Sequence, residues 1–194
     1  DLPPGRDDFN PDLNLGYSTG QGNSPFGLGW GLSVPDVRRK TSKGVPRYRA
    51  EEDTFVLSGS EDLVRVDEER DGDEIRTRFR PRTEGLYGRV VRHRSLRDDY
   101  WRVHTTDGLI STYGADPDGS DRAVLADPER PGNVFAWMLS STEDPLGNRI
   151  EYHYVLDEGD GAERPGVQLY LDRVQYTNYE RDGDEQFLVS VSFE

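Results

Sequence analysis

The chain has 194 residues, a formal net charge of −14, and equal shares, 32% each, of hydrophobic and charged residues. This acidic balance argues against sequence-independent nucleic-acid binding, in which neutralised phosphates supply most of the affinity. No apolar run approaches the roughly 18 residues that a membrane span needs, and the lack of cysteine excludes disulfides, thiolate zinc sites and a cysteine nucleophile.

The first expected strand covers residues 13–17, where apolar and polar or small residues alternate. The glycine-rich stretch 16–31 overlaps it and lacks the lysine and the helix that a phosphate-binding loop requires. Pro25 also takes the place of the third glycine in a dinucleotide fingerprint. We therefore expect a structural role, in which small residues allow close backbone approach while Phe26 and Trp30 fill the space beside them.

Alternation with a period of two, the signal of strands, continues along the chain. Further strands are expected at residues 54–58, 63–66, 75–79, 89–93, 100–105, 109–113, 134–139, 150–154, 169–177 and 187–193. Hairpin turns are expected at dipeptides that tolerate a positive φ, namely Asp71-Gly72, Asp107-Gly108, Asp118-Gly119, Gly147-Asn148, Asp160-Gly161 and Asp182-Gly183. The best helical candidate is 121–126, which Asp127-Pro128 would end. The predicted fold class is all-β, with many short antiparallel strands joined by tight Gly, Asp and Asn turns.

We expect residues 1–194 to form a single β domain. The stretch 116–132 is a polar connector that contains three prolines. The expected strands before and after it have the same kind of pattern, so one continuous assembly is favoured over two domains. Residues 187–194 form a strand pattern that stops before it is complete, which indicates a fragment of a larger protein.

Two acidic clusters raise the question of a calcium site. The run Asp67-x-Glu69-x-Asp71-Gly72 begins like a twelve-residue calcium loop, but Arg78 stands at its twelfth position. In the stretch 116–121 the glycine comes too early. We interpret both clusters as solvated turns.

The remaining polar residues show no catalytic pattern. The histidines at positions 93, 104 and 153 lie in separate expected strands without further metal ligands, and His93 and His104 would be neighbours only if residues 89–94 pair with 101–106. Eleven arginines and nine acids lie between Arg65 and Arg102, which we interpret as a solvated, ion-paired face of a sheet. No Gly-x-Ser-x-Gly motif is present, so we predict no catalytic residue, no cofactor and no metal site.

Several longer stretches are more specific than this general pattern. They read GNSPFGLGW at 22–30, RKTSKGVPRY at 39–48, DTFVLSG at 53–59, FRPRTEG at 79–85, YWRV at 100–103, WML at 137–139 and DPLGNRIEYHY at 144–154. Together they resemble the SpvB-type N-terminal domain of bacterial Tc toxin B components and of SpvB-like and Rhs toxins. The stretch 144–154 also resembles a YD repeat, in which a Gly-Asn turn leads into a tyrosine-bearing strand.

The residues that we expect to form the structural motif are Gly20, Gly22, Phe26, Gly27, Gly29, Trp30, Lys43, Gly44, Pro46, Tyr48, Phe55, Trp101, Trp137, Gly147, Asn148 and Tyr152. Among them the aromatic residues are expected to be packing anchors, and the glycines to be turn or close-approach positions. If Trp30 and Trp137 are buried, replacing either with alanine is expected to cost roughly 3–5 kcal/mol.

The resemblance implies a non-catalytic structural segment of a secreted bacterial toxin, part of a β-sheet shell that encloses or presents a C-terminal toxic effector. It implies as partners the remainder of the same polypeptide, a Tc toxin C-type or Rhs partner, and a pore-forming A component that contacts regions outside this chain. It leaves open which of these toxin classes the chain comes from and which effector is carried. The alternative is an extracellular β-rich module that binds carbohydrate or protein, with calcium stabilising its acidic turns.

Overall fold

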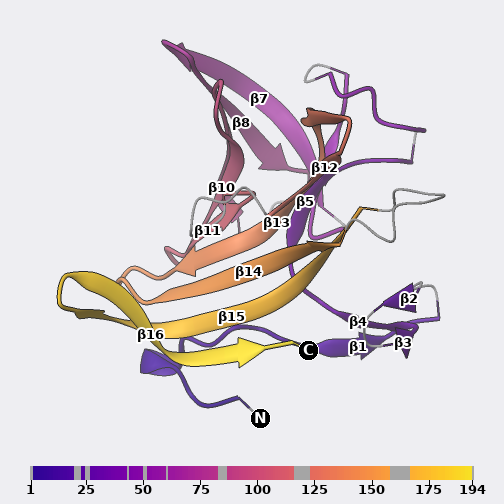
Figure 1. Cartoon of the computed structure of the whole chain (residues 1–194). Helices are drawn as coiled ribbons and strands as arrows, with labels where there is room; N and C mark the ends of the chain where they lie inside the picture. Colours follow the sequence, from indigo (N-terminus) through magenta and orange to yellow (C-terminus); the bar gives the residue numbers. More distant parts are fainter. Residues whose placement is uncertain are drawn as a thin grey trace.

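The structure is a computed structural model that describes residues 2–19, 23–24, 27–42, 44–49, 52–59, 61–82, 87–115, 123–157 and 167–193, with backbone alone for residues 23, 24 and 87. The described residues contain strands, turns and one short 3-10 helix, so the predicted all-β class is confirmed (Figure 1). Within these residues no helix has the length and the apolar character needed to cross a bilayer.

The helix is η1 (Arg6–Asp8). The strands are β1 (Leu15–Tyr17), β2 (Asn23–Ser24), β3 (Gly27–Leu28), β4 (Trp30–Leu32), β5 (Asp36–Arg39), β6 (Phe55–Leu57), β7 (Glu61–Asp71), β8 (Glu74–Pro81), β9 (Tyr87–Arg94), β10 (Asp99–Thr105), β11 (Ile110–Tyr113), β12 (Val124–Asp127), β13 (Arg130–Glu143), β14 (Arg149–Asp157), β15 (Gln168–Arg181) and β16 (Asp184–Ser192). The pairs β1–β4 and β2–β3 form two small sheets apart from the large one.

Eight strands of the large sheet close into a ring. Strands β5 to β11 are antiparallel neighbours in chain order, and β13 pairs with both β5 and β11. The length of β13 allows this, because its residues 136–138 pair with β5 while its residues 139–143 pair with β11. Closure gives partners to backbone groups that would otherwise line two open edges.

The same strand also carries the rest of the sheet. Residues 141–143 of β13 pair with β14, from which β15 and β16 continue as an antiparallel meander, and β12 pairs with the first half of β13. Figure 1 shows this meander, coloured orange to yellow, with the N-terminal segment passing alongside it. The Tyr176 hydroxyl donates a hydrogen bond of 2.7 Å to the Pro3 carbonyl and so ties that segment to β15.

Large aromatic side chains fill the ring. Phe55, Trp101 and Trp137 are at most 1% exposed, and their ring centroids lie 5.0 Å (Phe55–Trp101) and 5.8 Å (Trp101–Trp137) apart. Phe79 lies 4.9 Å from Trp101. These contacts join β6, β8, β10 and β13 across the ring, because the four strands alternate around it and all four residues belong to one core cluster.

The structure corrects three expectations about elements. Residues 124–126 of the helical candidate lie in strand β12, because they pair with the first half of β13. For the same reason residues 124–127 and 130–132 belong to strands rather than to a polar connector, while residues 116–122 lie outside the described part. Strand β5, with Val37 fully buried, has no counterpart among the expected strands.

Four of the expected turns lie between paired strands. These are the turns at Asp71-Gly72, Asp107-Gly108, Gly147-Asn148 and Asp182-Gly183, and each of their glycines has a positive φ, between 60° and 93°. The two other expected turns, at residues 118–119 and 160–161, lie outside the described residues. Turn chemistry therefore identified these four hairpins, but it did not predict the turns at residues 95–98, between β9 and β10, and at residues 128–129, between β12 and β13.

Candidate functional site

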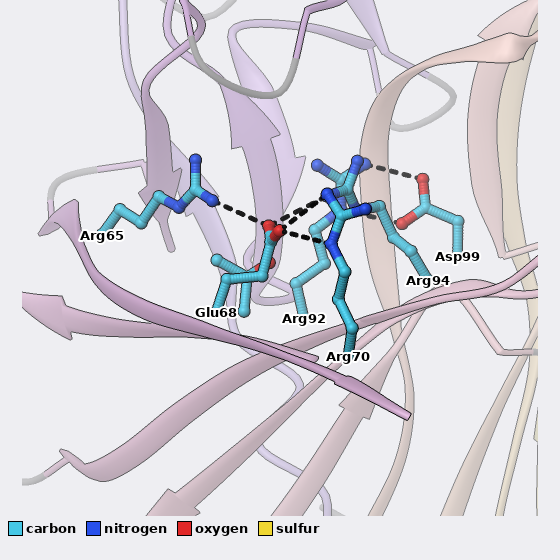
Figure 2. Close-up of polar contacts among 7 residues, drawn as sticks. Arg65, Glu68, Arg70, Arg92, Arg94 and Asp99 are labelled. Atoms are coloured by element: carbon cyan, nitrogen blue, oxygen red, sulfur yellow. Dashed lines mark hydrogen bonds and ion pairs between the residues drawn. The ribbon is translucent and has the colours of Figure 1, made fainter. Parts of the chain in front are cut away.

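A cluster of charged side chains lies beside the aromatic core of the ring, and Figure 2 shows its contacts. We call it the arginine cluster, and it consists of Arg65, Glu68, Arg70, Arg92, Arg94 and Asp99. Residues of β9 two apart share a face of the sheet, which places Arg92 and Arg94 together.

A β-bulge completes the arginine cluster. Arg65 and Glu68 are three positions apart on β7, a spacing that would normally place them on opposite faces. The register shift between Arg65 and Asp67 brings both side chains to the same face.

Glu68 is the centre of the arginine cluster. Its carboxylate oxygens accept hydrogen bonds from Arg65 Nη2 at 2.7 Å and from Arg70 Nε at 3.2 Å. Arg94 Nη2 lies 3.6 Å from Glu68 Oε2, within ion-pair distance, and Thr77 Oγ1 donates a hydrogen bond to the same oxygen at 3.3 Å. Burial opposes ionisation of Glu68, but the hydrogen bond from Arg70 and the charge of Arg65 outweigh it and lower its pKa.

Two buried arginines lie inside the ring, Arg92 of the arginine cluster and Arg39. Arg92 is 3% exposed and donates two hydrogen bonds to the Asp99 carboxylate, at 2.8 and 2.7 Å. Its Cζ lies 4.6 Å from the centroid of the Trp137 ring. The Asp99 carbonyl accepts a hydrogen bond of 2.9 Å from Trp137 Nε1, so this aspartate connects the buried charge to the aromatic core.

Arg39 is the counterpart of Arg92 on strand β5. It donates hydrogen bonds of 2.7 Å to Asp53 Oδ2 and to the Val134 carbonyl, and its Cζ lies 5.1 Å from the ring centroids of both Tyr48 and Phe55. Burial lowers the pKa of Arg39, and the nearby charge of Arg92 adds to the effect. A buried ion pair of this kind is costly to break, because its partner would remain charged and unpaired.

The expected solvated face of arginines is therefore only partly correct. Arg65, Arg70, Arg76 and Arg78 are at least partly exposed and form ion pairs with nearby acids. Arg92 is buried, because its position in the alternation of β9 points into the ring. Sequence reasoning missed this arginine and Arg39, and the available signal was the two-residue spacing of Arg92 from the buried Val90.

The structure does not bring the expected motif residues into one site. Phe55, Trp101, Trp137 and Tyr152 are buried in the core. Tyr48 stacks under Arg39, and Pro46 is partly exposed. Asn148 is buried, and its side-chain amide donates a hydrogen bond of 2.8 Å to Asp144. Gly20, Gly22, Phe26 and Lys43 lie outside the described residues.

Trp30 differs from the expected packing anchor. It is 41% exposed, because strand β4 pairs with β1 in a small two-stranded sheet that lies apart from the ring. Its ring centroid lies 5.4 Å from that of Tyr17 on the paired strand. Trp30 therefore does not belong to the aromatic core that Trp101 and Trp137 form.

The glycines of the motif occupy positions that favour glycine. Gly27, Gly29, Gly44 and Gly147 all have positive φ angles. Gly29 is also a close-approach position, because a Cβ there would lie 2.6 Å from the ring of Tyr17.

The histidines and acidic turns show no common site. Strands β9 and β10 pair as expected, but His93 faces Tyr100 and His104 faces Arg89. Asp67, the first acid of the calcium-like run, forms an ion pair with Arg78, the residue at its twelfth position. Among the described residues, no group of three or more histidine, aspartate or glutamate side chains is arranged to hold a metal ion.

A hollow of about 660 Å³ opens beside the arginine cluster. Arg94 and Asp99 border it from β9 and β10, and Val124 and Val134 border it from β12 and β13. Arg94 and Asp99 can therefore be reached from this hollow, while Arg65 and Arg70 are themselves partly exposed.

Comparisons with known proteins agree with this architecture. The family model described as Salmonella virulence plasmid 65kDa B protein, SpvB, matches residues 1–193. The proteins named mono(ADP-ribosyl)transferase SpvB from Salmonella typhimurium and Salmonella dublin are each 32% identical over 196 residues. The match covers 88% of this chain and 32% of each relative, so the chain spans about a third of their length.

Solved structures show the same fold. The N-terminal domain of effector protein SpvB from Salmonella typhimurium strain LT2 superposes with a TM-score of 0.80 at 29% identity, over 96% of this chain and 68% of that one. A TcdB2-TccC3 complex matches with a TM-score of 0.78 at 30% identity, over 88% of this chain and 9% of that one. The Photorhabdus luminescens Tc holotoxin pore matches with a TM-score of 0.77 at 30% identity, over 90% and 9%.

The closed ring, the meander that continues from it and these matches define a toxin-associated structural domain. The chain belongs to the SpvB family. The resemblance stated from the sequence is therefore confirmed.

Proposed function

We propose that this chain is a non-catalytic structural segment of a secreted bacterial toxin. In this role it forms part of a β-sheet shell that encloses or presents a C-terminal toxic effector, and residues 1–194 act as one β domain. The main support for the proposal is the position of strand β13. This strand belongs both to the closed ring and to the sheet that continues into the meander.

A strand shared in this way makes a stiff wall. The ring cannot move relative to the meander without breaking backbone hydrogen bonds along β13, and each bond left without a partner costs free energy. The interior of the ring is occupied by Phe55, Trp101 and Trp137 and by the paired Arg39 and Arg92. A packed interior of this kind suits a structural support.

The proposed partners follow from the likeness to Tc assemblies. The solved structures that match include TcdB2-TccC3 complexes and a Tc holotoxin pore. We propose that this chain contacts the remainder of its own polypeptide and a Tc toxin C-type or Rhs partner, and that a pore-forming A component binds elsewhere in the assembly. We propose that the ADP-ribosyl transfer in the relatives' name belongs to a region outside the segment that corresponds to this chain.

The experiment is protease protection of the effector in the complete toxin assembly. In the wild type, the effector is expected to resist limited proteolysis until the shell unfolds. Trp137→Ala is expected to expose the effector at a lower temperature, because it leaves a cavity between β13 and the other strands of the ring. Trp30→Ala is the matched control, since this tryptophan lies outside the core, and protection is expected to stay as in the wild type.

Two results would contradict the proposal. One is an effector that is digested equally fast in the wild-type assembly and in free form, because a shell would then give no protection. The other is loss of the effector's enzymatic turnover in Trp137→Ala assemblies whose effector is still folded, because this chain would then contribute to catalysis.

A further inference from the structure

The arginine cluster has more positive than negative charge. Its four guanidinium groups face two carboxylates, which leaves two positive charges in excess. Adding the neighbouring Arg39–Asp53 pair leaves this balance unchanged. The local excess stands out because the whole chain has a net charge of −14.

The excess charge lies on three of the arginines. Arg92 is neutralised by its two hydrogen bonds to Asp99, whereas Arg65, Arg70 and Arg94 share Glu68. One carboxylate accepts about four hydrogen bonds, whereas three guanidinium groups offer about fifteen N–H donors. Nε of Arg94 is buried and has no hydrogen-bond partner among the residues that the structure describes.

The three arginines can be reached from solvent. The Arg70 side chain is 71% exposed and that of Arg65 is 36% exposed, and Arg94 borders the hollow beside β12. Figure 2 shows Arg65 on one side of the Glu68 carboxylate and Arg70 on the other, both pointing toward it. An anion that enters here would meet guanidinium groups on more than one side.

We propose that Arg65, Arg70 and Arg94 bind a phosphate-class oxyanion beside Glu68. Guanidinium groups form paired, charge-assisted hydrogen bonds with phosphate oxygens. A phosphate group carries close to two negative charges at neutral pH, which matches the excess of the arginine cluster. In this arrangement Glu68 holds the three guanidinium groups in place while the site is empty.

Calorimetric titration of the whole chain with inorganic phosphate, at constant ionic strength set with sodium chloride, tests the proposal. Saturable binding is expected, and Arg65→Gln and Arg70→Gln are each expected to weaken it at least about tenfold. Arg181→Gln, at a similarly exposed arginine on the far end of β15, is the matched control and is expected to change the affinity less than twofold. A phosphate monoester titrated in parallel distinguishes free phosphate from a phosphate carried on a larger ligand.

Glu68→Gln separates anion binding from a purely structural role. If the site binds phosphate, removing the competing carboxylate strengthens phosphate binding about tenfold, and phosphate restores much of the melting temperature that the variant loses. If the arginine cluster only stabilises the ring, the melting temperature falls and phosphate restores none of it.

The proposal is overturned by the absence of saturable heat up to 10 millimolar phosphate, on the order of the weakest binding that such a site would be expected to show. It is also overturned if Arg65→Gln and Arg70→Gln bind phosphate as the wild type does, or if Glu68→Gln binds it more weakly. Both arginines are at least partly exposed, so these variants are expected to fold, and a far-ultraviolet circular dichroism spectrum checks this.

Discussion

Two tryptophans provide much of the packing inside the ring. Trp101 and Trp137 are fully buried and contact each other and Phe55. Trp101→Ala and Trp137→Ala are each expected to lower the free energy of unfolding by about 3–5 kcal/mol, because each leaves a large cavity. Urea unfolding measures the loss.

Trp30→Ala, at an exposed position, is the control. It is expected to lower the free energy of unfolding by about 1 kcal/mol or less. Equal losses at all three positions would contradict the assignment of Trp101 and Trp137 to the core.

Thr177 has an unusual backbone conformation. Its φ is +62°, a left-handed value that costs a residue with a Cβ about 1–2 kcal/mol, and its buried Oγ1 has no hydrogen-bond partner among the described residues. Thr177→Gly is expected to raise the free energy of unfolding by about 1 kcal/mol, because the strain removed exceeds the entropic cost of glycine.

Thr112→Gly is the matched control for Thr177, because Thr112 lies in β11 without a positive φ. This control is expected to lose stability in the same urea titration. A Thr177→Gly variant that also loses stability would show that the left-handed conformation stores no strain.

Glu74 links stability to pH. A hydrogen bond from Arg76, followed by one from His93, lowers the pKa of Glu74 from its ordinary 4.5 to about 2. Because the folded pKa lies below the unfolded one, the stabilisation is fully present above about pH 4.5 and is lost as the pH falls toward 2.

Glu74→Gln is therefore expected to be less stable than the wild type at pH 6 and to lose less stability between pH 6 and pH 3. Thermal unfolding at both values measures the two losses, with Glu129→Gln as a control at an exposed acid whose side chain forms no ion pair in the described structure. Identical pH dependence in Glu74→Gln and the wild type would show that this carboxylate is not coupled to folding.

At the scale of elements, the contact between β11 and β13 depends on one glycine. Gly114 follows β11 with a φ of +88°, and a Cβ there would lie 2.4 Å from Trp137 Cδ1. Gly114→Ala is expected to cost about 2–4 kcal/mol, from overpacking together with the unfavourable φ. Gly132→Ala, on β13 with no atom near the new Cβ, is expected to be close to neutral. Similar unfolding midpoints for the two variants would contradict this contact.

The sequence alone predicts those elements whose pattern is local. Alternation and Asp-Gly turns predict the hairpins β7–β8, β10–β11 and β15–β16, because these signals lie within the strands and turns themselves. Strand β5 is short and β12 contains residues that also suit a helix, so each depends on the edge of β13 with which it pairs. Local propensity carries no information about that edge.

The candidate site is less predictable than the fold. The register shift between Arg65 and Asp67 that brings Arg65 beside Glu68 has no clear signature in the sequence, and an arginine-rich strand normally indicates an exposed face. The burial of Arg92 follows from ring closure through β13, which pairs with β5 although the two strands are about a hundred residues apart in the chain. Sequence reasoning therefore identified the arginines but placed Arg92 on the wrong side of the sheet.

At the scale of the whole molecule, β13 makes the ring and the meander one body. Its residues pair with β5, β11, β12 and β14. Unfolding of the ring therefore removes a partner from the meander as well. We expect both parts to unfold in a single cooperative transition.

Native-state hydrogen exchange, followed residue by residue in low concentrations of denaturant, tests this account most directly. The slowest amides of β6, β9 and β10 in the ring and of β14 and β15 in the meander are expected to exchange with one common free energy, equal to that of global unfolding. If the amides of β14 and β15 exchange by a separate opening of clearly lower free energy while the ring stays closed, the two parts do not form one wall.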